Sequence, residues 1–131
     1  MDLSGKLLIA MPEMRDPRFT SAVIFVCSHS DSGAMGLTIN KPSSDYKFLD
    51  LLKQLKIETD SLTPDVSVSI GGPVESGRGF VLHSPEYSLG DETLKIGSDF
   101  GMTASFEVLE ELAKSEGPKR GILMLGYSGW G

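Results

Sequence analysis

The pattern of apolar and polar positions along the chain predicts a fold rich in β-strands. Short runs with a period of two and many β-branched residues recur throughout the sequence, as expected of strands that bury one face or both. The strongest run, residues 22–29, is apolar on both faces, which is typical of a central strand. Turn-forming residues 30–33 follow it, so we expect residues 35–40 to return as its antiparallel partner, with Gly36 marking a bulge or a close backbone approach. Further strands are expected at residues 7–11, 66–70, 79–83, 93–96 and 122–125.

Two stretches have the helical period instead, which makes the expected fold class α+β. Apolar residues spaced at i, i+3 and i+4 form one face of an amphipathic helix. We expect Ser43, Ser44 or Asp45 to cap the first helix and Thr103 to cap the second, because short polar side chains accept hydrogen bonds from free N-terminal amides. The predicted apolar faces are Phe48, Leu51, Leu52 and Leu55 in the first helix, and Phe106, Leu109, Leu112 and Ala113 in the second.

Composition and charge narrow the class of protein. The chain has 131 residues, 40% hydrophobic and 23% charged, which fits a single folded domain spanning residues 1–131. Its single cysteine, and the absence of a secretory leader or of an apolar run near ~20 residues, indicate a cytoplasmic protein that does not span a membrane. The net charge is -6 and the basic residues are scattered, so direct nucleic-acid binding is disfavoured.

Cys27 and His29 are the first candidates for chemistry. Two residues apart on one strand, they are expected on the same face, with Cβ atoms roughly 7 Å apart. A thiolate beside an imidazolium would be a reactive nucleophile or redox sensor, and Asp31 in the adjoining turn could orient the imidazole. The alternative is a buried cysteine that fills a small space in the core, which is the commoner role of a free cysteine.

His83 and a glycine-rich segment, residues 71–79, are the next candidates. Two histidines and one cysteine could bind zinc in principle, but their spacing matches no known zinc motif, so neither a metal nor another cofactor is expected. Backbone amides around Gly72, with Arg78 adding positive charge, could hold an anion. The competing interpretation is a tight crossing of two chain segments, because no phosphate-binding motif is present.

Three segments that combine glycine or proline with charged or aromatic side chains, residues 12–19, 71–79 and 127–131, are predicted to carry a binding site. Loops at strand ends are where a sheet usually presents binding groups. We therefore expect at least two of these segments to meet near Cys27 or His83 and to line the best-formed pocket. The candidate ligand-binding residues are Arg15, Arg18, Gly72, Arg78, His83, Tyr127 and Trp130.

Three sequence blocks resemble the bacterial AlgH/YqgE family. They are GKLLIAMPEMRDPRFTSAVIFVCSHSDSGAMGLTINKP at residues 5–42, GGPVESGRGFVLHS at residues 71–84 and GYSGWG at residues 126–131. The resemblance implies a bent, branching, mostly antiparallel sheet that closes partly into a small barrel flanked by helices. Members of this family also continue beyond the last block, so the resemblance implies that this chain lacks their C-terminal segment.

Members of the family are described as uncharacterised proteins or as transcriptional regulators, and the resemblance supplies no catalytic residues. We therefore expect a non-enzymatic regulatory protein that binds an unidentified small molecule or protein partner. The alternative is a thiol-based redox sensor or enzyme that uses Cys27. A third hypothesis, direct DNA binding, would require scattered cations to gather on one surface.

Overall fold

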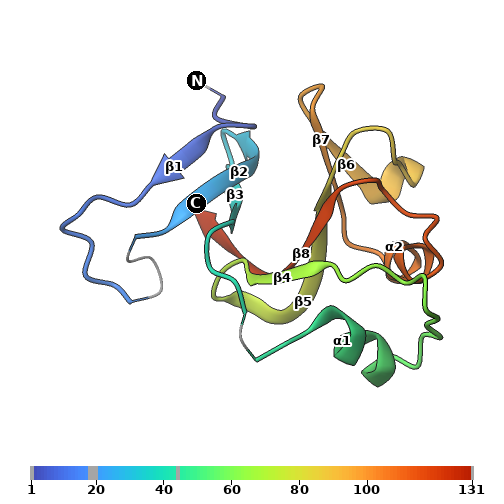
Figure 1. Cartoon of the computed structure of the whole chain (residues 1–131). Coiled ribbons are helices and arrows are strands. Elements are labelled where there is room, and N and C mark those ends of the chain that lie inside the picture. The colour runs from blue at the N-terminus through green and yellow to red at the C-terminus, as the bar shows by residue number, and fades with distance from the viewer. Residues whose placement is uncertain (1, 18–20, 44, 131) are drawn as a thin grey trace.

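The computed structural model describes residues 2–17, 21–43 and 45–130, which form an α+β fold of eight strands, two α-helices and one short 3-10 helix (Figure 1). The predicted strands and both helices are present, with shifted ends. In chain order the elements are β1 (Leu7–Ile9), β2 (Val23–Ser30), β3 (Gly33–Thr38), α1 (Phe48–Gln54), β4 (Ser67–Ile70), β5 (Val74–His83), η1 (Gly90–Glu92), β6 (Thr93–Ile96), β7 (Phe100–Thr103), α2 (Phe106–Ala113) and β8 (Gly121–Trp130).

All eight strands belong to one bent sheet that forms a half-barrel. Seven strands follow the order β1-β2-β3-β8-β5-β7-β6 with antiparallel neighbours, while β4 pairs in parallel with β8. The sheet branches along β8: residues 122–125 pair with β4, and residues 128–130 pair with β3. The mostly antiparallel, branching half-barrel implied by the family resemblance is confirmed.

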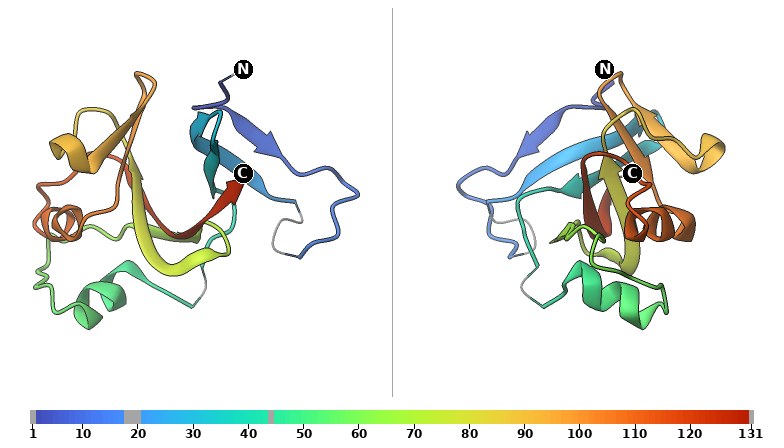
Figure 2. Two further views of the ribbon diagram at one scale, coloured as in Figure 1. Left: turned by 180° about the vertical axis from the view of Figure 1, so that it is seen from behind. Right: turned by 45° about the vertical axis from the view of Figure 1, so that its right-hand side comes forward.

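The two faces of the sheet bury separate cores. The strand period of two sends Phe80 and Leu82 of β5 to the inner core and Val81 to the outer one. The outer core lies against both helices, where Phe48 and Leu52 of α1 are fully buried. Figure 2 shows α2 on the opposite side of the molecule from β1, and among the described residues neither helix covers the β1–β2–β3 part of the sheet. Both described helices therefore stabilise the half-barrel from the side of the outer core.

Several local predictions are wrong. Residues 100–103 form strand β7, so Thr103 is a fully buried strand residue and Ser105 takes the N-cap position of α2. Lys47 is the N-cap residue of α1, in place of the expected Ser43 or Asp45, and Ser44 lies outside the described residues. On the predicted helix faces, Phe106 and Leu55 are largely exposed, and Val108 is buried in α2. Each helix buries the side that packs against β4, β5 and β8. The apolar period alone does not determine which side of the helix that is.

The glycine-rich segments predicted as irregular loops are largely strands. β5 begins at Val74, although its pairing with β8 is irregular between Val74 and Gly79, and β8 continues through Gly126 to Trp130. Gly126 has a φ of 77°, in the left-handed region that glycine adopts without strain, and this allows β8 to bend and change partners at the branch. The tight crossing of two segments, predicted as one reading of these glycines, is present at this bend.

Candidate functional site

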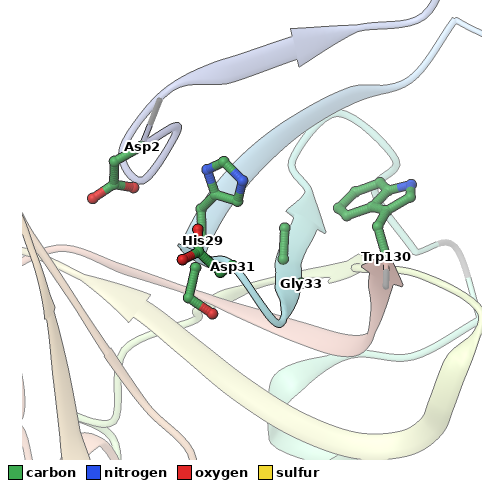
Figure 3. A pocket seen from close by; sticks show the side chains of 7 residues that line it. Asp2, His29, Asp31, Gly33 and Trp130 are labelled. Atoms are coloured by element: carbon green, nitrogen blue, oxygen red, sulfur yellow. The ribbon is translucent and has the colours of Figure 1, made fainter.

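A hollow of about 600 Å³ lies where the N-terminal segment, the β2–β3 turn and the end of β8 come together (Figure 3). The pairing of Ala34 with Trp130 brings residues 96 positions apart to one place. In the close-up view Asp2 lies on one side of the hollow and Trp130 on the other, with His29 and Asp31 between them. The lining residues are Asp2, His29, Ser30, Asp31, Gly33, Ala34 and Trp130.

A β-bulge in β2 determines which way His29 points. The register of β2 against β3 shifts between Val26 and Ser28, leaving Cys27 as an extra residue without a partner on β3. Beyond the bulge, His29 lies opposite Ala34, whose neighbour on the next strand is Trp130. The expectation that Cys27 and His29 share a strand face is therefore wrong, because the bulge interrupts the alternation on which it depended.

His29 is held in place by the N-terminal segment. The backbone N–H of Leu3 donates a hydrogen bond of 2.9 Å to Nδ1 of His29. A neutral imidazole that accepts at Nδ1 carries its proton on Nε2, so the free nitrogen can donate to a ligand. Asp31 does not supply the Nδ1 contact, contrary to the orienting role considered from the sequence.

The hollow is acidic. Backbone and side-chain hydrogen bonds from Ser4 hold the pKa of the Asp2 carboxyl below its ordinary value, and the nearby His29 adds to the effect. Asp31 contributes a second exposed carboxyl group, and no lysine or arginine is among the residues that line this hollow. At neutral pH the hollow therefore presents negative charge around a histidine.

Trp130 supplies an apolar wall on the side of the hollow opposite Asp2. The indole is 39% exposed, and a Cβ atom placed on Gly36 would lie 3.3 Å from its Cζ3 atom. Gly36 thus leaves room for the ring to lie across β3, and the close backbone approach predicted at this glycine is that of the Phe25 carbonyl oxygen, which would lie 3.2 Å from the same Cβ position. A hollow lined by carboxylates and an accessible indole attracts cations, through both charge and the negative face of the ring.

Cys27 lies in the inner core instead of at a surface. Its thiol is 2% exposed and lies 3.7 Å from the carbonyl oxygen of Phe25, and burial raises its pKa to about 12. Reactive cysteines need a thiolate and access to a reactant, and Cys27 has neither at neutral pH. The geometry corresponds to the space-filling cysteine considered from the sequence.

His83 belongs to a buried chain of hydrogen bonds. Its Nδ1 lies 2.8 Å from the carbonyl oxygen of Ser84 and must donate there, so Nε2 of the neutral ring accepts from Thr103, whose Oγ1 is 2.8 Å away. The Thr103 oxygen lies 2.7 Å from Oγ1 of Thr93, which itself accepts from the backbone N–H of Leu89. Every donor in this chain has an acceptor when His83 is neutral, which is the pattern of a structural histidine.

The structure places the remaining predicted residues in different surroundings. Arg78 forms an ion pair of 3.6 Å with Glu75 and its guanidinium lies over the ring of Phe80, so its charge is already matched. Gly72 packs so closely on β8 that an added Cβ would lie 2.3 Å from the carbonyl carbon of Tyr127. Arg15 is exposed on the loop between β1 and β2, and Arg18 lies outside the described residues.

The predicted site residues are spread over several hollows and share no single one. Arg78 and Tyr127 line one together, so two of the three predicted segments do meet, beside the inner core that holds Cys27. His29 and Trp130 line another, His83 a third, and Gly72 a fourth. Sequence reasoning missed Asp2 as a lining residue, because only the fold brings the N-terminal segment to the β2–β3 turn.

Two features are absent from the part of the chain that the structure describes. Within residues 2–17, 21–43 and 45–130, no three His, Cys, Asp or Glu side chains are grouped so that they could hold a metal ion. Over the same residues, no helix has the length and apolar character needed to cross a membrane.

Comparison with known proteins gives the family and the fold. A family model described as AlgH-like matches residues 7–131. A UPF0301 protein of Jannaschia sp. is 56% identical over 99% of this chain and 68% of its own length, and one of Cereibacter sphaeroides is 53% identical over 100% of this chain and 71% of its own. Neither name states an activity.

Two solved structures have the same fold. The solution structure of the AlgH protein from Pseudomonas aeruginosa is 41% identical with a TM-score of 0.76, over 95% of this chain and 65% of that one. The crystal structure of protein DIP2367 from Corynebacterium diphtheriae, 19% identical, has a TM-score of 0.71 over 98% of this chain and 66% of that one. The chain therefore spans just under two thirds of each solved relative.

Proposed function

We propose, for a chain that belongs to the AlgH-like family, that its role is binding and not catalysis, and that the hollow between Asp2 and Trp130 takes a small cationic ligand. The observation that carries the proposal is the composition of that hollow: two carboxylates, a tethered imidazole and an accessible indole, with no lysine or arginine in the lining. The family resemblance favours a regulatory role in the cytoplasm, in which the ligand would act as a signal.

The electrostatics of the hollow support a cation over an anion. Asp2 is held in its charged form, and the chain as a whole carries a net charge of -6, so an anion would be repelled at long and short range. A cation over the face of a tryptophan gains roughly 0.5–2 kcal/mol, and a carboxylate at hydrogen-bonding distance adds to this. An alkyl-ammonium group fits both requirements.

A binding role also fits the arrangement of the potentially reactive groups. Cys27 and His29 are separated by the bulge, and both ring nitrogens of His83 are engaged in hydrogen bonds. The thiol-dependent alternative would need a thiolate at Cys27, and burial works against that form. A DNA-binding form of the regulatory hypothesis would need a basic surface, for which the scattered cations and net charge of -6 give no support.

The single tryptophan of the chain makes the first prediction simple to test. Because Trp130 lies at the edge of the hollow, its fluorescence should change in a saturable way when 1,4-diaminobutane is added, and should not change with the neutral analogue 1,4-butanediol. Asp31→Asn should weaken the binding of the diamine about tenfold, since a hydrogen bond to a charged group contributes roughly 1.5–3 kcal/mol.

Glu58→Gln is the matched control, because Glu58 is an exposed acidic residue outside the lining of the hollow, and its affinity for the diamine should equal that of the wild type. Equal losses in Asp31→Asn and Glu58→Gln would mean that only the general negative charge attracts the diamine. No saturable signal up to about 10 mM diamine would leave the hollow without the proposed ligand class.

A further inference from the structure

Strand β1 is an edge strand composed entirely of exposed aliphatic residues. Leu7, Leu8 and Ile9 are 53%, 36% and 72% exposed, on both faces of the strand. Met11, which follows, is 66% exposed. Proteins commonly protect sheet edges with charges, prolines or covering segments, because an apolar edge invites pairing with another strand. β1 itself carries no such protection.

The outer edge of β1 has free backbone hydrogen-bonding groups. β1 pairs with β2 so that Leu8 lies opposite Ile24, and in this ladder Lys6 accepts from Val26 while Ala10 donates to Ala22. Antiparallel strands alternate bonded and non-bonded pairs, so the even-numbered residues bond to β2 and the backbone groups of Leu7 and Ile9 point away from it. Among the described residues, no strand pairs with that outer edge.

The other open edge of the sheet differs in character. β6 carries Lys95, and Ile96 near its end is 2% exposed and lies close to Gly5, where an added Cβ would be 3.8 Å from Cγ2 of Ile96. A lysine on an edge strand disfavours the approach of another apolar strand. The unprotected apolar edge is therefore a property of β1 in particular.

We propose that the outer edge of β1 is a self-association surface, where two copies of the chain pair antiparallel about a two-fold axis through Leu8. The outward groups of Leu7 would bond to Ile9 of the partner subunit, and those of Ile9 to the partner's Leu7. This register follows from the parity of the ladder, since a symmetric pairing centred on Leu8 aligns the outward-facing groups with one another. A two-fold interface needs no surface other than this one.

The side chains suit the same register. The pairing sets Leu7 beside the partner's Ile9 on one face and Leu8 beside the partner's Leu8 on the other, so that exposed apolar groups cover each other. The one charged residue of the ladder, Lys6, falls opposite the partner's Ala10, and no like charges face each other directly. A second copy therefore supplies the apolar strand, the hydrogen-bonding parity and the charge pattern that this edge requires.

Sedimentation or light scattering over a concentration series tests the association. The wild type should approach the mass of two chains as concentration rises, whereas Ile9→Lys should remain a single chain or need at least about tenfold more protein. Leu62→Lys is the matched control, because Leu62 is an equally exposed aliphatic residue, 77% accessible, in a loop. It should associate like the wild type, and circular dichroism should show all three proteins folded.

Cross-linking tests the register itself. Leu8 and the partner's Leu8 form a non-hydrogen-bonded pair, whose Cα atoms are about 4.5 Å apart, within the range of a disulfide. Leu8→Cys should therefore oxidise to a covalent dimer, whereas Leu62→Cys and the wild type, whose Cys27 is buried, should remain mostly uncross-linked. A single-chain mass for the wild type at every concentration, or Leu8→Cys cross-linking no faster than Leu62→Cys, would overturn the proposal.

Discussion

At the scale of single residues, the bulge at Cys27 determines the chemistry available to β2. Without it, the period of two would hold the thiol and the imidazole of His29 on one face. The bulge instead leaves Cys27 in the inner core, beside Phe25 and Leu37, and directs His29 to the hollow with Trp130. Because Cys27 is the extra residue of the bulge, its thiol and the imidazole of His29 lie on different faces of β2.

The buried thiol gives a prediction about reactivity. At pH 8 iodoacetamide should alkylate Cys27 at least about a hundredfold more slowly in the folded protein than in urea, because the thiolate is the reacting species and burial suppresses it. Mass spectrometry after timed quenching measures the fraction of Cys27 that is alkylated. Similar rates in the two states would mean that the Cys27 thiol is accessible in the folded protein, as a thiol-dependent function requires.

The same burial determines the direction in which pH changes the stability of the protein. The pKa of Cys27 is raised from 9.0 to about 12, so the folded protein holds this proton more tightly than the unfolded chain. Its contribution to stability is complete below pH 9.0 and is lost as the pH rises toward about 12. Tyr87, whose pKa is also raised by burial and by Glu111, contributes in the same direction. Comparing the pH dependence of the free energy of unfolding of the wild type with that of Cys27→Ala therefore isolates the contribution of the thiol.

At the scale of elements, the crossing of β8 and the segment before β5 depends on two glycines. A Cβ on Gly126 would lie 2.3 Å from the carbonyl oxygen of Gly72, and the φ of Gly126 is 77°. Such a contact leaves no room for a side chain, and the backbone atoms on both sides are held by sheet hydrogen bonds. The branch of the sheet is therefore expected to tolerate substitution poorly.

Gly126→Ala should lower the free energy of unfolding by about 2–4 kcal/mol, because it combines a steric clash with a strained backbone conformation. Gly77→Ala is the control: nothing lies within 4 Å of a Cβ at Gly77, and its stability should change by less than about 1 kcal/mol. Urea unfolding of the three proteins measures both effects. Equal stabilities for the two variants would contradict the tight crossing.

The elements that the sequence predicts well are those whose pattern is local. The run at 22–29 is recognisable because consecutive apolar residues, several of them β-branched, occupy both faces of the strand, and the first helix because its leucines repeat at helical spacing. β7 was missed because Gly101 resembles a turn residue. The structure explains that glycine: an added Cβ would lie 2.6 Å from Cε1 of His83, so the buried ring requires the absence of a side chain.

At the scale of the whole molecule, the candidate site was only partly predictable. His29 and Trp130 were both recognised as candidates, but for separate reasons, and nothing local relates a residue of β2 to the end of β8. Their proximity follows from the long-range pairing of β3 with β8 and from the bulge in β2, neither of which has a strong sequence signal. Long-range pairing is also what sends Arg78, Gly72 and His83 to other hollows.

The net charge gives a final prediction about the association proposed for β1. Each chain carries a charge of -6, so two copies repel each other at long range, while the pairing edge itself is apolar apart from Lys6. Raising ionic strength from about 0.01 M to 0.15 M shortens the screening length from about 30 Å to 8 Å, and should therefore tighten the dimer. Sedimentation equilibrium at the two salt concentrations measures this, with Ile9→Lys as a variant that should stay monomeric in both. A dimer that weakens with salt would mean that ion pairs hold the two copies together, and the apolar edge of β1 would then not be the surface that joins them.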